Sequence, residues 1–259
     1  MNTQNDNINL NPPAAETPVL TAPPAAGAAP LLSCVGLSKR FGHTAALDGA
    51  TFELQRGRIT GLLGPNGSGK TTLLKLACGL IAPSAGAILI NGLAPGAASK
   101  RAVSYLPERS YLNDWMRVEQ LVKFFADFYA DFDSARAGEM LHNLGIEPKA
   151  RLKTLSKGNQ EKVQLILVMS RNAQLYLLDE PIGGVDPAAR EYIIRTIIGN
   201  YQPESTVLLS THIITDIEQA LDDVIFLDHG RVTLQGSVDD IRAQHGRSVD
   251  SLFREVFRC

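Results

Sequence analysis

The sequence contains few cysteines, and their positions exclude two kinds of site. Cys34, Cys78 and Cys259 are the only three cysteines among 259 residues, and they are widely separated and odd in number. Such spacing fits neither a disulfide framework nor a cysteine-rich metal site. We therefore expect the chain to work in a reducing compartment.

Long apolar runs and an excess of one charge are also missing. The sequence has no run of eighteen apolar residues, so it predicts no membrane-spanning helix. A formal net charge of -2 at pH 7 argues against nucleic-acid binding through a basic surface. The hydrophobic content of 44% is ordinary for a globular domain with a sizeable core. If the protein acts at a membrane, another chain must span it.

Residues 1–30 lack the apolar pattern of a folded element. They consist mostly of Asn, Pro, Ala and Thr, and such a segment cannot bury enough apolar surface to offset its ordering entropy. We expect a disordered tail. The first basic residue is Lys39, so we expect no signal peptide.

What the chain does contain is a phosphate-binding loop. Gly64–Thr71 reads G-P-N-G-S-G-K-T, which fits the P-loop pattern. The apolar run Ile59–Leu63 predicts a strand before it, and Thr72–Leu80 has the spacing of a helix after it. Loop amides and a helix N-terminus bind phosphate, with Lys70 reaching the β- and γ-phosphates and the Thr71 hydroxyl ligating Mg²⁺. The sequence therefore predicts nucleotide binding.

Short apolar runs predict the other strands, and helical spacing predicts a separate lobe. The runs cover residues 32–37, 50–54, 87–90, 102–106, 175–178, 206–209, 224–227 and 231–234, with Lys39–Gly42 expected to connect the first two. Helices are predicted over Arg117–Tyr129, where an aromatic stripe that ends at Phe128 is expected in the core, and after Asp133. Because this helical block interrupts the strands, we expect it outside the main sheet.

Further helices are predicted after residue 156. They cover Gln160–Met169, a segment from Asp186-Pro187, one after Ser237, and Asp250–Arg258 at the end. In the segment from Asp186, the side chains of Ile193, Ile194, Ile197 and Ile198 are expected to form the buried face.

Three residues beside predicted strands are further site candidates. Asp179 ends a buried run, where a carboxylate is costly unless it has a cation or donors, and in a P-loop protein that cation is Mg²⁺. The adjacent Glu180 is placed to orient or deprotonate water. His212 follows another strand, where a structural hydrogen-bonding role is the default. From spacing alone, Phe41 is a core or edge aromatic rather than a base-stacking one.

Taken in order, these motifs resemble the ATP-binding subunit of ABC transporters over about residues 31–236. Gly64–Thr71 matches Walker A, and Leu175–Glu180 matches Walker B with the catalytic glutamate. Glu108 falls at the position of the Q-loop, Leu155–Asn159 at that of the signature, and Gly184–Asp186 at that of the D-loop. His212 falls at the switch histidine, and Phe41 at the adenine-stacking aromatic. Walker A alone is shared by many NTPases, but the remaining motifs in this order are specific to the family.

The resemblance implies a fold, cofactors and a set of site residues. The fold is an α/β P-loop NTPase core with a mixed sheet, an antiparallel β subdomain and an inserted helical subdomain at about residues 108–165, followed by a short C-terminal helical extension over 237–259. ATP and Mg²⁺ are implied. The implied residues are Glu180 and His212 for catalysis; Phe41, Gly64, Pro65, Asn66, Gly67, Ser68, Gly69, Lys70, Thr71, Thr72, Glu108, Ser156, Gly158 and Asp186 for nucleotide binding; and Thr71, Asp179 and Glu108 for the metal.

Three features depart from the usual family pattern. The Q-loop carries Glu108 rather than Gln, and the signature reads Leu-Ser-Lys-Gly-Asn, with Lys157 and Asn159 in place of Gly and Gln. Ser156 and Gly158, which the family presents to the γ-phosphate, remain. Such variants are similar to those of ABC-2-type export ATPases. The third departure is the terminal helix, which is too short for an added regulatory domain.

The resemblance also implies partners and a place in the cell. It implies an ATPase that drives transport, as an exporter, through a separate transmembrane permease on the cytoplasmic face of the inner membrane. A second copy or a related subunit would complete an ATP-sandwich dimer, the helical lobe near Tyr111–Trp115 would press on the permease, and no nucleic acid is expected. Two alternatives stay open: a soluble ABC ATPase of an assembly machine, and the ATPase of an importer.

Overall fold

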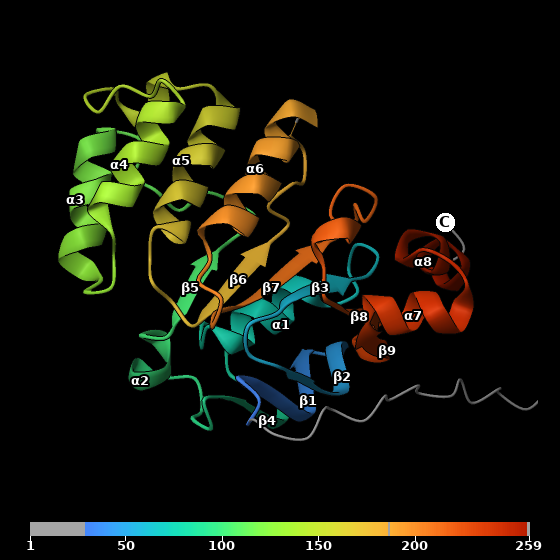
Figure 1. The fold of residues 1–259 in the computed structure, drawn as a ribbon. Helices are drawn as coiled ribbons and strands as arrows, with labels where there is room; N and C mark the ends of the chain where they lie inside the picture. The colour runs from blue at the N-terminus through green and yellow to red at the C-terminus, as the bar shows by residue number, and fades with distance from the viewer. Residues whose placement is uncertain (1–28, 186, 258–259) are drawn as a thin grey trace, which may run out of the picture.

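The computed structural model describes residues 29–185 and 187–257, which form two sheets with helices on both sides of the larger one (Figure 1). Residues 1–28 of the predicted tail lie outside the described part of the chain, as do Asp186 of the predicted D-loop and Cys259.

The larger sheet has six strands in the order β5-β6-β7-β3-β8-β9. All neighbours are parallel except β8 and β9, which form an antiparallel hairpin. The strands are β3 (Ile59–Leu63), β5 (Val103–Leu106), β6 (Leu175–Asp179), β7 (Thr206–Thr211), β8 (Asp223–Asp228) and β9 (Arg231–Ser237). Every residue of β3, β6 and β7 is buried, as expected when helices cover both faces. The carboxyl ends of these strands meet at one edge, which is where an open α/β sheet binds ligands.

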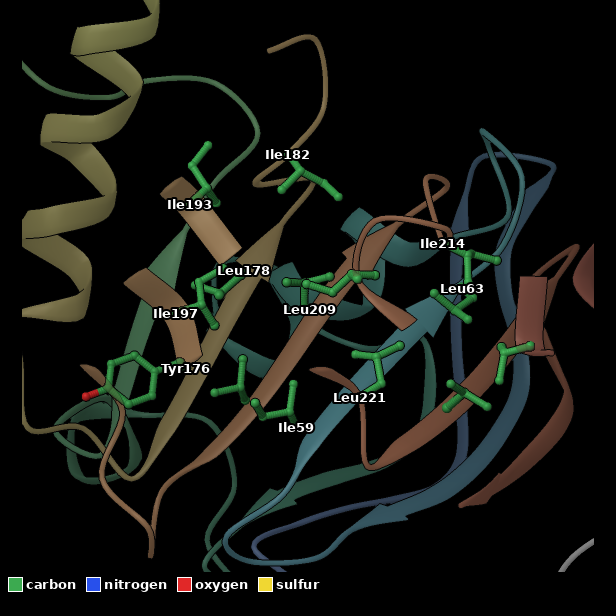
Figure 2. Close-up of a cluster of buried hydrophobic side chains, with 14 of the residues drawn as sticks. Ile59, Leu63, Tyr176, Leu178, Ile182, Ile193, Ile197, Leu209, Ile214 and Leu221 are labelled. Atoms are coloured by element: carbon green, nitrogen blue, oxygen red, sulfur yellow. The ribbon is translucent and has the colours of Figure 1, made fainter. Parts of the chain in front are cut away.

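The two faces of this sheet bury different helices. Helix α1 (Lys70–Ala77) packs on one face and, on its other side, on the smaller sheet. Helices α5 (Lys157–Met169) and α6 (Pro187–Asn200) pack on the opposite face, where Ile193 and Ile197 lie over Tyr176 and Leu178 (Figure 2). The prediction that Ile198 shares this buried face is wrong, because its side chain is 43% exposed. It follows Ile197 by about 100° around the helix and therefore turns toward solvent.

The smaller sheet is antiparallel, in the order β2-β1-β4. Its strands are β1 (Leu32–Phe41), β2 (Thr44–Leu54) and β4 (Ala85–Ile90). The predicted connection at Lys39–Gly42 is wrong, because Lys39, Arg40 and Phe41 pair with β2 as the last residues of β1. These residues follow shifts in the strand register, and such bulges break the polar–apolar alternation that would identify a strand in the sequence.

The inserted helices have a hydrophobic core of their own. Helices α3 (Val118–Phe128) and α4 (Ser134–Asn143) share one cluster of buried side chains with Val163, Ile166 and Leu167 of α5, and the 3-10 turn Leu152–Thr154 lies between α4 and α5. The Asp133 carboxylate accepts a hydrogen bond from the Arg136 amide at 2.9 Å and caps α4 as predicted. Phe125 is buried, but Phe128 is 70% exposed, so the prediction that the whole aromatic stripe is core is wrong at its last position.

Two helices follow β9 and pack beside the sheet. They are α7 (Val238–His245), which Ser237 caps by accepting from the Asp240 amide at 3.0 Å, and α8 (Val249–Phe257). The short segments α2 (Ala97–Lys100) and Glu218–Ala220 complete the elements. Among the described residues, none of the helices has both the length and the apolar character needed to cross a membrane.

Candidate active site

The P-loop runs from β3 to α1 and is pressed against neighbouring backbone at two glycines. A Cβ on Gly64 would lie 2.2 Å from the carbonyl oxygen of Leu227, and a Cβ on Gly69 would lie 2.4 Å from that of Ala46. Gly69 also has a φ of 110°, which side chains rarely adopt. Larger residues at either position would therefore displace the loop.

Lys70 begins α1 with its ammonium group folded back over the loop. Lys70 Nζ donates to the carbonyl oxygens of Gly64 at 2.8 Å and Pro65 at 3.2 Å. It also lies 3.4 Å from Glu180 Oε1, and only 6% of the lysine side chain is exposed. The loop thus holds a positive charge beside the carboxylate at the end of β6.

Asp179, the last residue of β6, is buried with one oxygen paired and one unpaired. Asp179 Oδ1 accepts from the Thr71 hydroxyl at 3.1 Å and from the Ser210 hydroxyl at 2.8 Å. Oδ2 is buried without a hydrogen-bond partner. Burial raises the pKa of Asp179, the two hydroxyl hydrogen bonds oppose this, and the negative charges of Glu108 and Glu180 add to it.

The unpaired oxygen and the Thr71 hydroxyl fit a Mg²⁺ ion that also binds substrate phosphate. A carboxylate oxygen buried without a donor is costly unless a cation compensates it. Within the described residues, no three His, Cys, Asp or Glu side chains form a group that could hold a metal ion. Mg²⁺ typically uses only one or two protein oxygens and takes the rest from phosphates and water, so this donor set suits it.

Glu180 and His212 form a pair at the same sheet edge. Glu180 Oε2 lies 3.0 Å from His212 Nδ1, while Glu180 Oε1 is buried with no hydrogen bond. The backbone of Glu180 has a φ of 49°, a left-handed conformation that is strained for a residue with a side chain. Its amide donates to both the carbonyl and the hydroxyl of Ser210, at 3.1 and 3.0 Å. The neighbouring strand therefore holds Glu180 in this conformation.

These groups line one cavity of about 790 Å³, a size typical of small-molecule sites. Five parts of the chain provide most of the lining: the P-loop with the start of α1, the segment after β5, one face of α5, residues 179–184 at the end of β6, and His212 after β7. Beside Leu106, Pro107, Leu165, Pro181 and Ile193, the lining consists of Ala46, Asn66, Gly67, Gly69, Lys70, Thr71, Thr72, Glu108, Arg109, Ser110, Lys157, Gln160, Glu161, Gln164, Asp179, Glu180, Gly183, Gly184 and His212.

Among the described residues, Gly64, Pro65 and Ser68 belong to the P-loop without lining the cavity, and three other predicted site residues lie outside both. Phe41 is 53% exposed at the end of β1, with Lys39 Nζ 5.1 Å from its ring centroid, and it does not line the cavity. Ser156 caps α5, its hydroxyl accepting from the Asn159 amide at 3.3 Å, and is exposed. A Cβ on Gly158 would meet nothing within 4 Å. Ser156 and Gly158 thus do not line the cavity of their own chain, although Lys157 between them does.

Sequence reasoning missed Ser210, which contacts both acidic residues. Its hydroxyl donates to Asp179, and the Glu180 amide donates to it. Ser210 faces Asp179 only because β6 and β7 are neighbours in register. A serine at the end of a predicted strand gives no sign of that pairing.

The chain is similar to ATP-binding subunits of known transporters. Residues 47–183 match a protein family described as ABC transporter. The chain is 35% identical over 218 residues to an uncharacterised ABC transporter ATP-binding protein of Methanocaldococcus jannaschii, covering 82% of this chain and 79% of that one. It is 31% identical over 226 residues to the Nod factor export ATP-binding protein I of Ralstonia nicotianae, covering 84% and 70%.

A solved structure agrees with these relatives. It is the structure of an ATP binding subunit of an ABC transporter, which matches with a TM-score of 0.79 at 31% identity and covers 88% of this chain and 99% of that one.

Proposed function

The chain belongs to the ABC transporter family, and from this premise we propose that it is the ATP-hydrolysing subunit of a membrane exporter. The resemblance found in the sequence is confirmed by the family match and by the solved ATP binding subunit. One observation carries the assignment of hydrolysis: Lys70, Thr71, Asp179, Glu180 and His212 all line a single cavity. Export is supported by the relative named for Nod factor export.

ATP is the substrate, and the P-loop is the part of the chain that holds its phosphates. The loop amides and the N-terminus of α1 bind negative charge, and Lys70 adds an ammonium group that is already desolvated. Thr71 and Asp179 would hold Mg²⁺, and Glu108, which lines the same cavity, is a further candidate ligand. When bound, Mg²⁺ neutralises charge on the phosphate oxygens.

Glu180 is the proposed base for the attacking water. The water oxygen bonds to the γ-phosphorus, the bond from that phosphorus to the β–γ bridging oxygen breaks, and ADP and phosphate leave. Glu180 accepts the proton of the water, and His212, 3.0 Å from its carboxylate, keeps it oriented. No covalent enzyme intermediate is needed, since positioning and charge stabilisation provide the catalysis.

The proposed working unit is an ATP-sandwich dimer attached to a permease. Ser156 and Gly158 lie outside the cavity of their own chain, so a second copy or a related subunit would bring its signature to the γ-phosphate. A separate transmembrane subunit would supply the path through the membrane, and the chain would sit on the cytoplasmic face. The helical subdomain would contact that subunit.

The experiment that tests this function compares two lysines of α1 in the full chain purified with its membrane partner. Lys70→Ala should abolish ATP turnover with an unchanged circular dichroism spectrum, because Lys70 contacts the loop rather than the core. Lys75→Ala is the control: this lysine is exposed on the same helix, and turnover should stay normal. Wild-type hydrolysis by Lys70→Ala would refute the proposal. Failure to recover a transmembrane protein with the chain would favour the soluble alternative.

A further inference from the structure

The two catalytic residues, Glu180 and His212, are each followed by a segment that connects the site to the next helix or strand. Glu180 is followed by the loop 181–185, which leads to α6, and His212 is followed by residues 213–218, which lead to β8. At the cavity the two segments meet through the 3.0 Å contact between His212 Nδ1 and Glu180 Oε2. The far ends of the two segments are packed in the main core, with Ile182 and Val185 from one and Ile214 and Ile217 from the other.

Arg190 joins those far ends. Its Nε donates to the carbonyl oxygen of Val185 at 3.1 Å, and its Nη1 donates to Asp216 Oδ2 at 3.0 Å. Val185 closes the loop after Glu180, and Asp216 lies four residues after His212. One guanidinium on α6 therefore holds both segments, at the end opposite the His212–Glu180 contact.

We propose that Arg190 is a positioning residue that couples the loop after Glu180 to the segment after His212. This inference rests on the proposed function, because it assigns Arg190 a role in ATP hydrolysis at that site. Together the contacts form a closed ring, which runs from Glu180 to Val185, through Arg190 to Asp216, and back through His212 to Glu180. Arg190 does not line the cavity, so it acts only through the two segments.

The ring explains how Glu180 keeps a strained backbone. A left-handed residue with a side chain persists only where its surroundings fix it on several sides, and Glu180 has a φ of 49°. Ser210 holds its amide, and the ring restrains the chain that follows. The segment after His212 is fixed from its other side, since Ile214 and Ile217 are buried in the main core.

An arginine suits this bridge better than a lysine would. The side chains of Arg190 and Asp216 are 27% and 36% exposed, and ion pairs this open add little to folding stability. What the guanidinium offers is a planar fork whose separate N–H groups reach two acceptors at once, which a lysine ammonium does not reproduce. The role of Arg190 is therefore expected in turnover rather than in stability.

The test measures ATPase kinetics of the full chain purified with its membrane partner. Arg190→Ala and Asp216→Ala should each lower kcat by about tenfold, within the loss of up to about 100-fold that small displacements cause. KM for ATP should stay within about twofold of wild type, because the P-loop is untouched. The double variant should be no slower than the slower single variant, and Arg190→Lys should recover only part of kcat.

Arg195→Ala is the matched control. Arg195 lies on the same helix and pairs with Glu191 at 2.6 Å, and both side chains are exposed, so kcat should not change. Circular dichroism checks the fold of each variant. If Arg190→Ala unfolds, Asp216→Ala carries the test, because it removes only one end of the bridge. Wild-type kcat in folded Arg190→Ala or in Asp216→Ala overturns the coupling. If the wild-type protein does not hydrolyse ATP, or if Lys70→Ala hydrolyses ATP at the wild-type rate, the proposed function itself is overturned.

Discussion

At the scale of single residues, the site is built on carboxylates that are buried without full compensation. Asp179 is 1% exposed, and its Oδ2 has no hydrogen-bond donor. Glu180 is partly buried, and its Oε1 lacks a hydrogen bond but lies 3.4 Å from Lys70 Nζ. Buried charges normally find a partner. The unpaired Asp179 oxygen therefore marks where a cation is expected, and it makes the nucleotide-free chain less stable than its packing alone would allow.

Replacing Asp179 by asparagine should separate stability from ligand binding. Asp179→Asn keeps an oxygen that can accept from Thr71 and Ser210 and removes the buried charge. We expect the nucleotide-free chain to gain about 1 kcal/mol, which raises Tm by about 2–4 °C, and to lose the stabilisation that ATP with Mg²⁺ gives wild type. Thermal unfolding with and without ligand measures both effects.

The control for that experiment is a charge of the same type on the surface. Asp239 is 96% exposed, so Asp239→Asn should change neither Tm nor the response to ligand. A lower Tm for nucleotide-free Asp179→Asn would contradict the argument, because it would mean that the carboxylate is compensated within the protein.

At the scale of elements, Arg171 connects the helical subdomain to the main sheet. The Arg171 side chain is 4% exposed, and its guanidinium pairs with both carboxylate oxygens of Asp131 at 3.0 and 3.1 Å. It also donates to the backbone carbonyl oxygens of Arg101 and Val103 beside β5 and lies 4.0 Å from the ring centroid of Tyr129. Asp131 and Tyr129 follow α3, so one side chain links that helix to β5.

Asp131→Ala should weaken this connection. It leaves the buried guanidinium with its carbonyl partners only, and we expect a loss of about 1–3 kcal/mol, the range for hydrogen bonds to charged groups and for stranded polar groups. Urea unfolding measures the loss, and hydrogen exchange should place it in α3 and α4. Arg117→Ala, which removes an exposed pair with Glu119, should cost less than about 0.5 kcal/mol. Equal losses in the two variants would contradict the prediction.

Glu218 connects the two C-terminal helices, α7 and α8, to the segment that precedes β8. Its carboxylate accepts from Arg242 at 2.8 Å and from the amides of Val249 and Asp250 at 3.0 and 3.3 Å, which fixes the start of α8. Burial by itself would raise the pKa of Glu218, but Arg242 and the two amides outweigh it, and the pKa lies below its ordinary value of 4.5. The folded state thus binds this proton less tightly than the unfolded state.

The sign of that shift gives a pH prediction. Glu218 stabilises the fold above the unfolded pKa, and this contribution is lost as the pH falls through the lower folded pKa. At neutral pH, Glu218→Gln should cost about 1–2 kcal/mol, and the difference from wild type should shrink as the pH falls below 4.5. Melting curves across this range test it. Glu255→Gln, at an exposed pair with Arg247, is the control, and a difference for Glu218→Gln that persists in acid would contradict the prediction.

At the scale of the whole molecule, one chain holds half of each proposed catalytic site. The P-loop and the acidic pair line the cavity, but Ser156 and Gly158 do not. Each nucleotide would therefore join the P-loop of one copy to the signature of another, and its hydrolysis would release them.

Glu180→Gln should trap that joined state. The variant keeps the size of the side chain and removes its basicity, so hydrolysis should fall by about 100-fold or more while ATP still binds. Light scattering should then detect an ATP-dependent dimer, in the isolated chain or in its complex with the permease. Ser156→Arg in the same background should dissolve it. An inactive variant that never dimerises, even in the complex, would contradict the sandwich arrangement.

How much of this could be read from the sequence depends on the range of the interactions. The strand before the P-loop, the helix after it and the caps at Asp133 and Ser237 follow from residues within a few positions of one another, and the structure has them. The α/β fold with its mixed sheet and antiparallel subdomain was implied by the family resemblance that the motifs carry, and the structure has it. The end of β1 and the exposure of Ile198 within α6 were not predicted.

The sequence by itself determined which chemical groups are present and in which order, because each motif is a local run with its own backbone requirements. Only the tertiary structure decided which groups meet. The pairing of β6 with β7 sets Ser210 beside Asp179 and brings His212 to Glu180, although α6 separates the two strands in the chain. Arg190 is only five residues from Val185 in the chain, but it meets Asp216 only through the packing of α6. Strand pairing and helix packing depend on contacts over long sequence separations, and local patterns carry no record of them.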